Sequence, residues 1–382
     1  MPHPKVAMLD PSAFTPPYDR SLAAALARAG AEVELITSRF AYGPVPEPEG
    51  YGVTELFYTR ASGIPLGSRV RLPLKAAEHV PGMLAARMLI RGADVAHWQW
   101  VTYPPLDRFL LGKPRKGQPR VITLHYPLPP PGEEDKLDAE RKFLSRFDAV
   151  IAHTEGGAER LRSDVGLDPA AVHVIPHGPF DYLTELPESK QAPLPGELAD
   201  VPPERPVILF FGLLRPYKGI DLLLEAFAAL GETDAELWIA GMPRMPLEPL
   251  LELADRASGT VRFIPRFISD PEIPALMRRA DVLTLPYREI EQSGVLYTGL
   301  AFRKPMVLSD VGGFSEVGDA ARLVPPGDVD ALTAALAELV EDPAARERLS
   351  AAADASVRGD LGWDAIAART LELYASLGAR GG

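Results

Sequence analysis

The fold is decided by Val207-Ile-Leu-Phe-Phe-Gly212-Leu-Leu-Arg215-Pro-Tyr-Lys218-Gly219-Ile-Asp221, which joins three pieces of one structural unit. Five apolar residues end at Gly212, a short turn carries Arg215 and Lys218, and Gly219 opens an amphipathic segment. This pattern predicts a buried strand, a tight loop and a helix. Because the first N–H groups of a helix lack acceptors and the helix dipole is positive there, the loop suits a diphosphate. A surface loop with two solvated cations is the alternative that this stretch alone leaves open.

The same alternation of short apolar runs and helical segments extends along the chain in both directions. Helical segments between the runs include Ser21–Ala29, Ala139–Phe147 and Gly157–Val165. Such alternation is typical of βαβ units, and it predicts an α/β fold with parallel sheets covered by helices on both faces. The expected strands are Val6–Leu9, Val33–Ile36, Val95–Trp98, Val121–Leu124, Ala149–Ala152, Val172–Ile175, Val207–Phe211, Leu237–Ala240, Val261–Ile264, Val282–Leu285 and Met306–Leu308.

A proline-rich segment interrupts this alternation and predicts a division into two domains. Residues 179–206 hold seven prolines in 28 residues, and a chain of 382 residues exceeds one ordinary core. We therefore expect two doubly wound, Rossmann-like domains, residues 1–180 and 207–361, joined by a linker at 181–206. A terminal helix, Trp363–Leu377 within 362–382, is expected to cross back onto the first domain. Ligands of such sheets bind at the carboxyl ends of the strands, so we expect the domains to face each other across a cleft.

Composition excludes several classes of protein. The chain has no cysteine, so it has no disulfide, no thiolate metal site and no thiol nucleophile. No apolar run reaches the roughly 20 residues of a membrane-spanning helix, and the N-terminus passes directly into a predicted strand. The default expectation is therefore a cytoplasmic protein.

The charge is distributed unevenly. Residues 1–180 hold 21 basic and 20 acidic side chains, so the net charge of −12 resides in the second half. An acidic chain of this kind argues against binding to nucleic acid. Local basic clusters leave open a weak peripheral contact with anionic lipid at the inner face of a membrane, beside their ordinary interpretation as solvated surface. These clusters are Arg69, Arg71 and Lys75; Lys113, Arg115, Lys116 and Arg120; and Arg141, Lys142 and Arg146.

A second junction between a loop and a helix follows the predicted strand Val282–Leu285. Ser293, Gly294 and Val295 begin a helix there, and their N–H groups would face an anion. Glu289 and Glu291 come just before, close to where a sugar ring would follow a bound phosphate. The alternative is that both acids cap the helix.

Five motifs, in order, resemble the retaining GT-B glycosyltransferases, specifically the nucleotide-sugar-dependent enzymes of family four. The resemblance covers nearly the whole chain. It implies that a hexose passes from a UDP-, GDP- or ADP-sugar to a hydroxyl acceptor with retained configuration, without a metal ion or other cofactor. The donor is expected on the C-terminal domain and the acceptor on the N-terminal one. The motifs are Ile175–Gly178, Phe211–Phe227, Ala280–Pro286, Lys304–Glu316 and Val324–Asp328.

The resemblance also implies roles for individual residues. Lys218 is expected on the β-phosphate with Arg215 as its partner, since a guanidinium holds two phosphate oxygens. His125 matches a histidine beside the sugar, whereas His177 matches a position that shapes the interdomain turn. The catalytic set is thus His125, Arg215, Lys218 and Glu291. Further donor contacts are expected from Gly212, Arg266, Phe267, Ile268, Glu289, Ser293, Gly294, Val295 and Thr298. Apart from the resemblance, acceptor contacts are expected from Tyr18 and Asp19 of the first loop and from Trp98 and Trp100 at a strand end, although at least one of the two tryptophans is expected in the core instead.

Three features depart from the family pattern. Leu213 occupies the usual place of an arginine, so Arg215 is expected to supply that charge. The second of two glutamates is absent, and Thr298 or Gly299 stands there. The first loop, Pro11–Asp19, lacks the usual pair of glycines. Other functions that remain open are a GT-B glycoside phosphorylase, a nucleotide-sugar epimerase and a non-catalytic nucleotide-sugar-binding protein.

Overall fold

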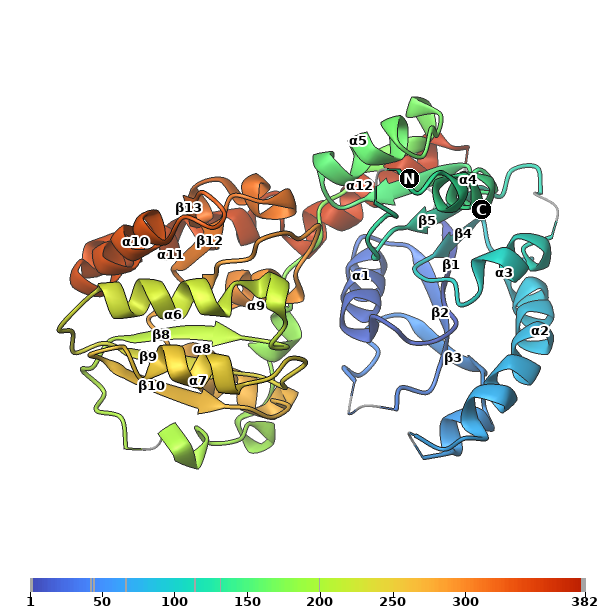
Figure 1. The fold of residues 1–382 in the computed structure, drawn as a ribbon. Coiled ribbons are helices and arrows are strands. Elements are labelled where there is room, and N and C mark those ends of the chain that lie inside the picture. The colour runs from blue at the N-terminus through green and yellow to red at the C-terminus, as the bar shows by residue number, and fades with distance from the viewer. Residues whose placement is uncertain are drawn as a thin grey trace. The chain divides into compact units, whose positions relative to one another are not determined.

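The chain forms two compact units in a computed structural model that describes residues 3–41, 43, 45–65, 67–112, 115–130, 132–198 and 200–378. One unit comprises Met1–Gly178 together with Gly362–Gly382, and the other comprises Pro179–Leu361. Each is built on one parallel sheet with helices beside it (Figure 1). Lys113, one of the predicted basic residues, lies outside the described residues.

The first unit has a seven-stranded sheet in the order β3-β2-β1-β4-β5-β6-β7. Its strands are β1 (Lys5–Asp10), β2 (Glu32–Ser38), β3 (Gly52–Phe57), β4 (Val95–Trp98), β5 (Arg120–Thr123), β6 (Ala149–Ala152) and β7 (Val172–Val174). Its α-helices are α1 (Pro16–Arg28), α2 (Arg71–Ile90), α3 (Pro104–Leu110), α4 (Glu134–Leu144), α5 (Glu155–Ser163) and α12 (Trp363–Ser376).

The second unit has a six-stranded sheet in the order β10-β9-β8-β11-β12-β13. Its strands are β8 (Val207–Phe211), β9 (Glu236–Ala240), β10 (Thr260–Ile264), β11 (Val282–Leu285), β12 (Met306–Ser309) and β13 (Arg322–Val324). Its α-helices are α6 (Ile220–Ala229), α7 (Glu248–Ala254), α8 (Ile273–Arg279), α9 (Gly294–Ala301), α10 (Val329–Glu341) and α11 (Pro343–Arg358). Short 3₁₀ turns connect several elements, among them η6 (Pro216–Lys218).

The predicted α/β fold and all eleven predicted strands are confirmed to within two residues at either end. The prediction missed β3 and β13. These are edge strands whose residues are mostly partly exposed, so they lack the continuous apolar run that marks a buried strand. Helix α1 begins at Pro16, five residues before the predicted start, because proline at a first helical position needs no N–H acceptor.

Both faces of the first sheet are buried. Val6 and Met8 of β1 belong to a core shared with α1 and α12, whereas Ala7 and Leu9 belong to a second core shared with α2, α4 and α5. Side chains alternate between the faces of a strand, so a strand covered on both sides must be apolar throughout. This double burial is the physical reason that short apolar runs predicted the strands.

The C-terminal helix α12 packs against α1, as predicted for a helix that crosses back to the first domain. Ile366 and Tyr374 of α12 are buried in the core that contains Leu22 and Leu26 of α1. None of the helices in the described ranges is both long and apolar enough to span a membrane.

The proline-rich segment predicted as a linker is part of the second unit. Leu183, Leu198 and Val201 are buried in its core. The segment is also held by charge: Arg205 donates to Glu236 Oε1 at 3.1 Å, while Arg262 donates to Glu236 Oε2 at 2.8 Å and to the Glu197 carbonyl at 3.0 Å. Prolines prevent a regular helix or strand there, but they do not prevent the neighbouring leucines from burying apolar surface.

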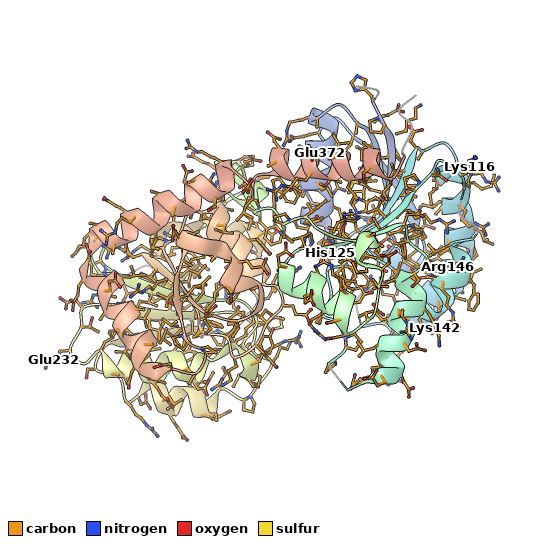
Figure 2. The ribbon with its side chains drawn as sticks, turned by 90° about the horizontal axis from the view of Figure 1, so that it is seen from above. Lys116, His125, Lys142, Arg146, Glu232 and Glu372 are labelled. Atoms are coloured by element: carbon orange, nitrogen blue, oxygen red, sulfur yellow. The ribbon has the colours of Figure 1, made fainter. Side chains whose placement is uncertain are left out.

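Removing the Glu236 side chain should destabilise the second unit. Glu236 is fully buried and also accepts the indole N–H of Trp238 at 3.1 Å, so Glu236→Ala removes an acceptor shared by Arg205, Arg262 and this indole. We expect a loss on the order of 3 kcal/mol in the free energy of unfolding, measured by urea denaturation. The control is Glu232→Ala, which removes an exposed carboxylate at the end of the preceding helix (Figure 2). An equal loss of unfolding free energy in Glu236→Ala and Glu232→Ala would contradict the stabilising role assigned to Glu236.

Candidate active site

A cavity of about 360 Å³ opens in the second unit where β8 and β11 end. The loops after these two strands both contribute to its lining, because the strands run parallel and are neighbours in the sheet. The cavity brings together six residues that the sequence predicted as donor or catalytic residues: Gly212, Lys218, Ser293, Gly294, Val295 and Thr298.

Lys218 provides the buried cation of this cavity. Its side chain is only 7% exposed, and Nζ donates a hydrogen bond of 2.9 Å to the hydroxyl of Tyr287. The amine also lies 4.7 Å from the centre of that ring. Burial, together with the nearby charge of Arg215, lowers the pKa of Lys218 to about 8. An ammonium group has three protons, so after the bond to Tyr287 it can still donate to an anion in the cavity.

Two glycines make this geometry possible. Gly219 has φ +66° at the start of α6, and a Cβ there would lie 2.0 Å from the carbonyl oxygen of Pro286. Gly212 has φ +117°, and a Cβ there would lie 3.2 Å from Lys218 Nζ and 3.0 Å from Val295 Cγ2. The absence of a side chain at Gly212 therefore keeps open the space in front of the amine.

The N-terminus of α9 lines the same cavity. Ser293 is the N-cap residue, and its side chain makes no capping hydrogen bond. The structure therefore makes Ser293, rather than Glu289 or Glu291, the capping position. The first N–H groups of the helix have no intrahelical acceptor, and the helix dipole adds partial positive charge there. A buried ammonium group and a helix N-terminus thus line one small cavity, an arrangement suited to a diphosphate.

Arg215 does not line this cavity, although Leu213 does. Leu214 is held in an extended conformation, because its N–H donates to Met242 at 3.0 Å and its carbonyl accepts from Arg244 at 2.9 Å. The chain then carries Arg215 to an exposed position. The structure therefore does not place the Arg215 side chain where the missing arginine was expected, and it acts on the cavity only through its nearby charge.

The remaining predicted donor residues lie around the same edge of the sheet but not in the cavity lining. Glu289 is exposed and Glu291 is partly exposed, and the Glu291 carbonyl accepts from Gly313 N–H at 3.2 Å. Arg266 pairs with Glu272 at 2.7 Å after the end of β10. Beside it, Phe267 is 57% exposed, while Ile268 is buried.

Thr298 lines the cavity from the second turn of α9. Its hydroxyl donates to the Gly294 carbonyl at 2.9 Å within the same helix. Only the acceptor lone pairs of that hydroxyl are therefore left for a ligand.

In the first unit, His125 lies in a chain of hydrogen-bonded histidines at the carboxyl ends of the strands. His125 Nδ1 is 3.2 Å from His153 Nε2, and His153 Nδ1 is 2.9 Å from the Ile175 carbonyl. Because a carbonyl only accepts, His153 must donate from Nδ1, and in its neutral form it accepts the proton of His125 Nδ1. The other nitrogen of His125, Nε2, is then an acceptor and lies 3.1 Å from Gln99 Oε1, so a hydrogen bond between them requires the Gln99 amide turned by 180°, with its NH₂ group toward His125.

Burial holds these histidines in the neutral form. It lowers the pKa of His125 well below the ordinary histidine value, and the charges of His153, His177 and His97 add to this effect. Burial likewise lowers the pKa of His153 to about 4 and that of His97 to about 3. His125 is thus a neutral hydrogen-bonding group near pH 7 and keeps a partly exposed surface. Figure 2 labels it within the first unit.

Three of the four predicted acceptor residues are buried in the structure, and for Trp98 this agrees with the core role expected of one tryptophan. Tyr18, Asp19 and Trp98 are each at most 3% exposed. The Tyr18 ring packs 4.6 Å from His125 and 5.3 Å from Trp363, and burial raises the pKa of Asp19 beside Asp10. These side chains were predicted to contact the acceptor because they lie in a loop or at a strand end, but they are packed in the core.

Trp100 is the predicted acceptor residue that keeps a partly exposed surface. Its indole N–H donates to Thr15 at 2.8 Å, and its ring stacks on His125 at 5.7 Å.

Two residues of these sites were missed by the sequence interpretation. Tyr287 directly follows the Leu285-Pro pair at the end of β11, and His153 directly follows β6. The rule that selected His125, a polar side chain just after a buried strand, would have found both.

The comparisons with known proteins agree with this architecture. Residues 19–178 match the family model for Glycosyltransferase Family 4, and residues 205–342 match that for Glycosyl transferases group 1. The chain is 28% identical to a D-inositol 3-phosphate glycosyltransferase of Kineococcus radiotolerans over 94% of this chain and 89% of that one. It is 26% identical to an MMP alpha-(1->4)-mannosyltransferase of Mycolicibacterium hassiacum over 69% and 67% of the two chains.

Solved structures show the same fold. A sucrose-phosphate synthase from Thermosynechococcus elongatus superposes with a TM-score of 0.71 at 21% identity, over 98% of this chain and 99% of that one. HepE from Anabaena, solved with UDP-glucose, gives a TM-score of 0.65 at 20% identity over 98% and 100%. With both halves of the chain matched by the family's models and both sheets arranged as in GT-B enzymes, the protein belongs to the family-four (group 1) glycosyltransferases.

Proposed function

We propose that this enzyme is a retaining hexosyltransferase that uses a nucleoside diphosphate sugar, with UDP-, GDP- or ADP-hexose as the candidate donors. The observation that carries the proposal is the 360 Å³ cavity in which the buried amine of Lys218 and the N-terminus of α9 lie together. Relatives that transfer sugars and a neighbour solved with UDP-glucose support this choice of donor class.

Charge stabilisation is the catalytic task that this cavity performs. Breaking the glycosidic bond leaves a nucleoside diphosphate whose negative charge grows in the transition state. Lys218 and the first N–H groups of α9 are already in place to stabilise that charge, so no reorganisation is needed as the bond breaks. The proposal includes no metal ion and no other cofactor. Within the described residues, no three His, Asp or Glu side chains are grouped so as to hold a metal.

The other residues take the roles that the family resemblance implies. We assign Glu291, with Glu289 before it, to the hydroxyls of the donor sugar, and Arg266–Ile268 to the base through backbone atoms. His125, neutral and donating from Nδ1 to His153, accepts a hydrogen bond at Nε2 from a hydroxyl of the sugar or the acceptor. Retention of configuration rests on the family resemblance.

The direct test is a screen of nucleotide sugars by thermal shift, followed by mass spectrometry of products with hydroxyl acceptors. A stabilising donor that is hydrolysed slowly alone and transferred in the presence of an acceptor supports the proposal. Products that require inorganic phosphate would instead indicate a phosphorylase, an epimerised donor would indicate an epimerase, and binding without turnover would indicate a non-catalytic protein.

Lys218→Ala should reduce turnover to background while leaving the thermal unfolding temperature close to that of the wild type. The variant removes the buried cation but keeps the backbone of the loop. The matched control is Lys190→Ala, which removes an exposed lysine of the same unit and should leave turnover unchanged. Wild-type rates in Lys218→Ala would overturn the assignment of the diphosphate site.

The affinity for the donor should fall as the pH rises through 8. Because the pKa of Lys218 is about 8, its ammonium form predominates below that pH and is lost above it. We expect the donor KM to rise about tenfold between pH 7 and pH 9. Lys218→Arg keeps its charge over this range, so its donor KM should change far less. A wild-type KM that is flat over this range would contradict Lys218 as the contact.

His125→Ala should lower kcat more than it raises the donor KM, because the proposed bond forms at the reacting sugar rather than at the diphosphate. The control is His173→Ala in β7, a histidine that lies outside the hydrogen-bonded chain. Steady-state kinetics with the donor varied separates the two parameters. An unchanged kcat would reduce His125 to a structural residue.

A further inference from the structure

A second cavity, of about 1070 Å³, lies in the first unit and is strongly cationic. It is lined by the C-terminal ends of α2 and α3, by Lys142 of α4 and Arg146 just beyond that helix, and by β4 and the start of β5. Arg120 opens β5, whereas His125 follows the end of that strand, so the part of the cavity around Arg120 lies at the opposite edge of the sheet from the histidine chain. Figure 2 shows Lys142 and Arg146 together and away from His125. Six arginines and one lysine line the cavity, and no acidic residue does.

Three guanidinium groups converge on Gly112 at the end of α3. Arg120 Nη1 donates to the Gly112 carbonyl at 3.1 Å, and Arg146 Nη2 donates to the same oxygen at 3.2 Å. The Arg87 guanidinium lies against the same residue, since a Cβ on Gly112 would be 2.5 Å from Arg87 Nη2. The C-terminal carbonyls of the helix thus hold like charges close together.

The electrostatics of the cavity reflect this crowding. Burial lowers the pKa of Arg120, and the charges of Arg146 and Arg87 lower it further, while Asp148 acts in the opposite direction. The Asp148 carboxylate accepts the backbone N–H of Arg120 at 2.8 Å. Side chains that repel one another in the empty cavity gain stability when an anion binds between them.

Several of these groups retain unused hydrogen-bonding capacity. Arg108 Nε is buried and has no hydrogen-bond partner within the described structure. In the described ranges, no ion pair to a carboxylate joins Arg87, Arg108 or Arg146, whereas Lys142 pairs with Asp138. A phosphate group accepts two parallel hydrogen bonds from one guanidinium group. Four guanidinium groups around one cavity therefore suit a ligand whose several phosphate oxygens accept from more than one of them.

We propose that this cavity binds the phosphate group of an organic phosphate, held by Arg87, Arg108, Arg120 and Arg146. The lining also includes apolar side chains, among them Ile90, Leu111 and Phe109, which is 67% exposed. The ligand therefore carries an apolar part beside its phosphate. Two sources share this chemistry: the head group of an anionic phospholipid, and a soluble organic phosphate.

The position of the cavity separates this proposal from the diphosphate site. The donor cavity is in the second unit and depends on Lys218, whereas the arginines named here all belong to the first. Within a chain of net charge −12, a local cluster of cations creates a positive field that attracts anions to this one place.

The test adds two different pairs of substitutions to one full-length parent, Lys218→Ala, which lacks the proposed diphosphate site. Arg87→Gln with Arg108→Gln removes two charges from the cavity. Lys136→Gln with Arg141→Gln removes two charges from exposed positions on α4, where these residues pair with Glu133 and Asp138. Thermal unfolding of each variant checks the fold, and Arg146→Gln is the second cavity variant should the first fail to fold.

The probes are inorganic pyrophosphate, followed by calorimetry, and vesicles of phosphatidylglycerol or phosphatidylcholine, followed by sedimentation. We expect the cavity variant to bind at least tenfold more weakly than its parent and the control variant to bind within twofold of it. Pyrophosphate binding without vesicle binding identifies a soluble phosphate, and binding to phosphatidylglycerol vesicles alone identifies the lipid head group. The proposal would be overturned if the parent bound neither pyrophosphate nor vesicles. It would also be overturned if both pairs of substitutions weakened binding equally.

Discussion

Parallel pairing of the strands is the constraint on which the rest of this structure depends. A parallel sheet must be covered by helices on both faces, and its connections return every strand in the same direction. The loops that follow the strands therefore gather at one edge. In the second unit this edge joins the loops after β8 and β11 around Lys218, although about 75 residues separate them in the sequence. In the first unit it joins His125, His153 and His177.

Placement of charge explains how an acidic enzyme can bind anionic substrates. The donor cavity has one buried ammonium group, whose neighbours are a tyrosine hydroxyl and a helix N-terminus rather than a carboxylate. A lone cation in a small cavity is costly to bury unless something shares its charge, and the lowered pKa of Lys218 records that cost. In the proposed function, the negative charge of an incoming diphosphate offsets that cost. The cationic cavity of the first unit follows the same principle with guanidinium groups.

In the first unit, the buried polar residues are mostly satisfied by hydrogen bonds within the protein. Burial keeps His125, His153 and His177 neutral, and hydrogen bonds join His125 to His153, and His153 and His177 to backbone carbonyls. Asp10 accepts the N–H groups of Phe14 and Thr15, at 2.5 Å and 3.2 Å, and so fixes the proline-containing first loop.

The sequence by itself determined the fold and six residues that line the cavity of the second unit, because both follow from local patterns. A buried parallel strand must be apolar throughout, so most strands could be found to within two residues, and polar side chains after a strand must lie at the carboxyl edge. Only the tertiary structure decided which of those side chains stay accessible. Tyr18, Asp19 and Trp98 are buried, Arg215 is exposed and does not line the cavity, and residues 181–206 belong to the second unit. These outcomes depend on packing between segments distant in sequence, which no local pattern encodes. The cationic cavity is of the same kind, since its arginines come from five elements and loops that meet only in the folded unit.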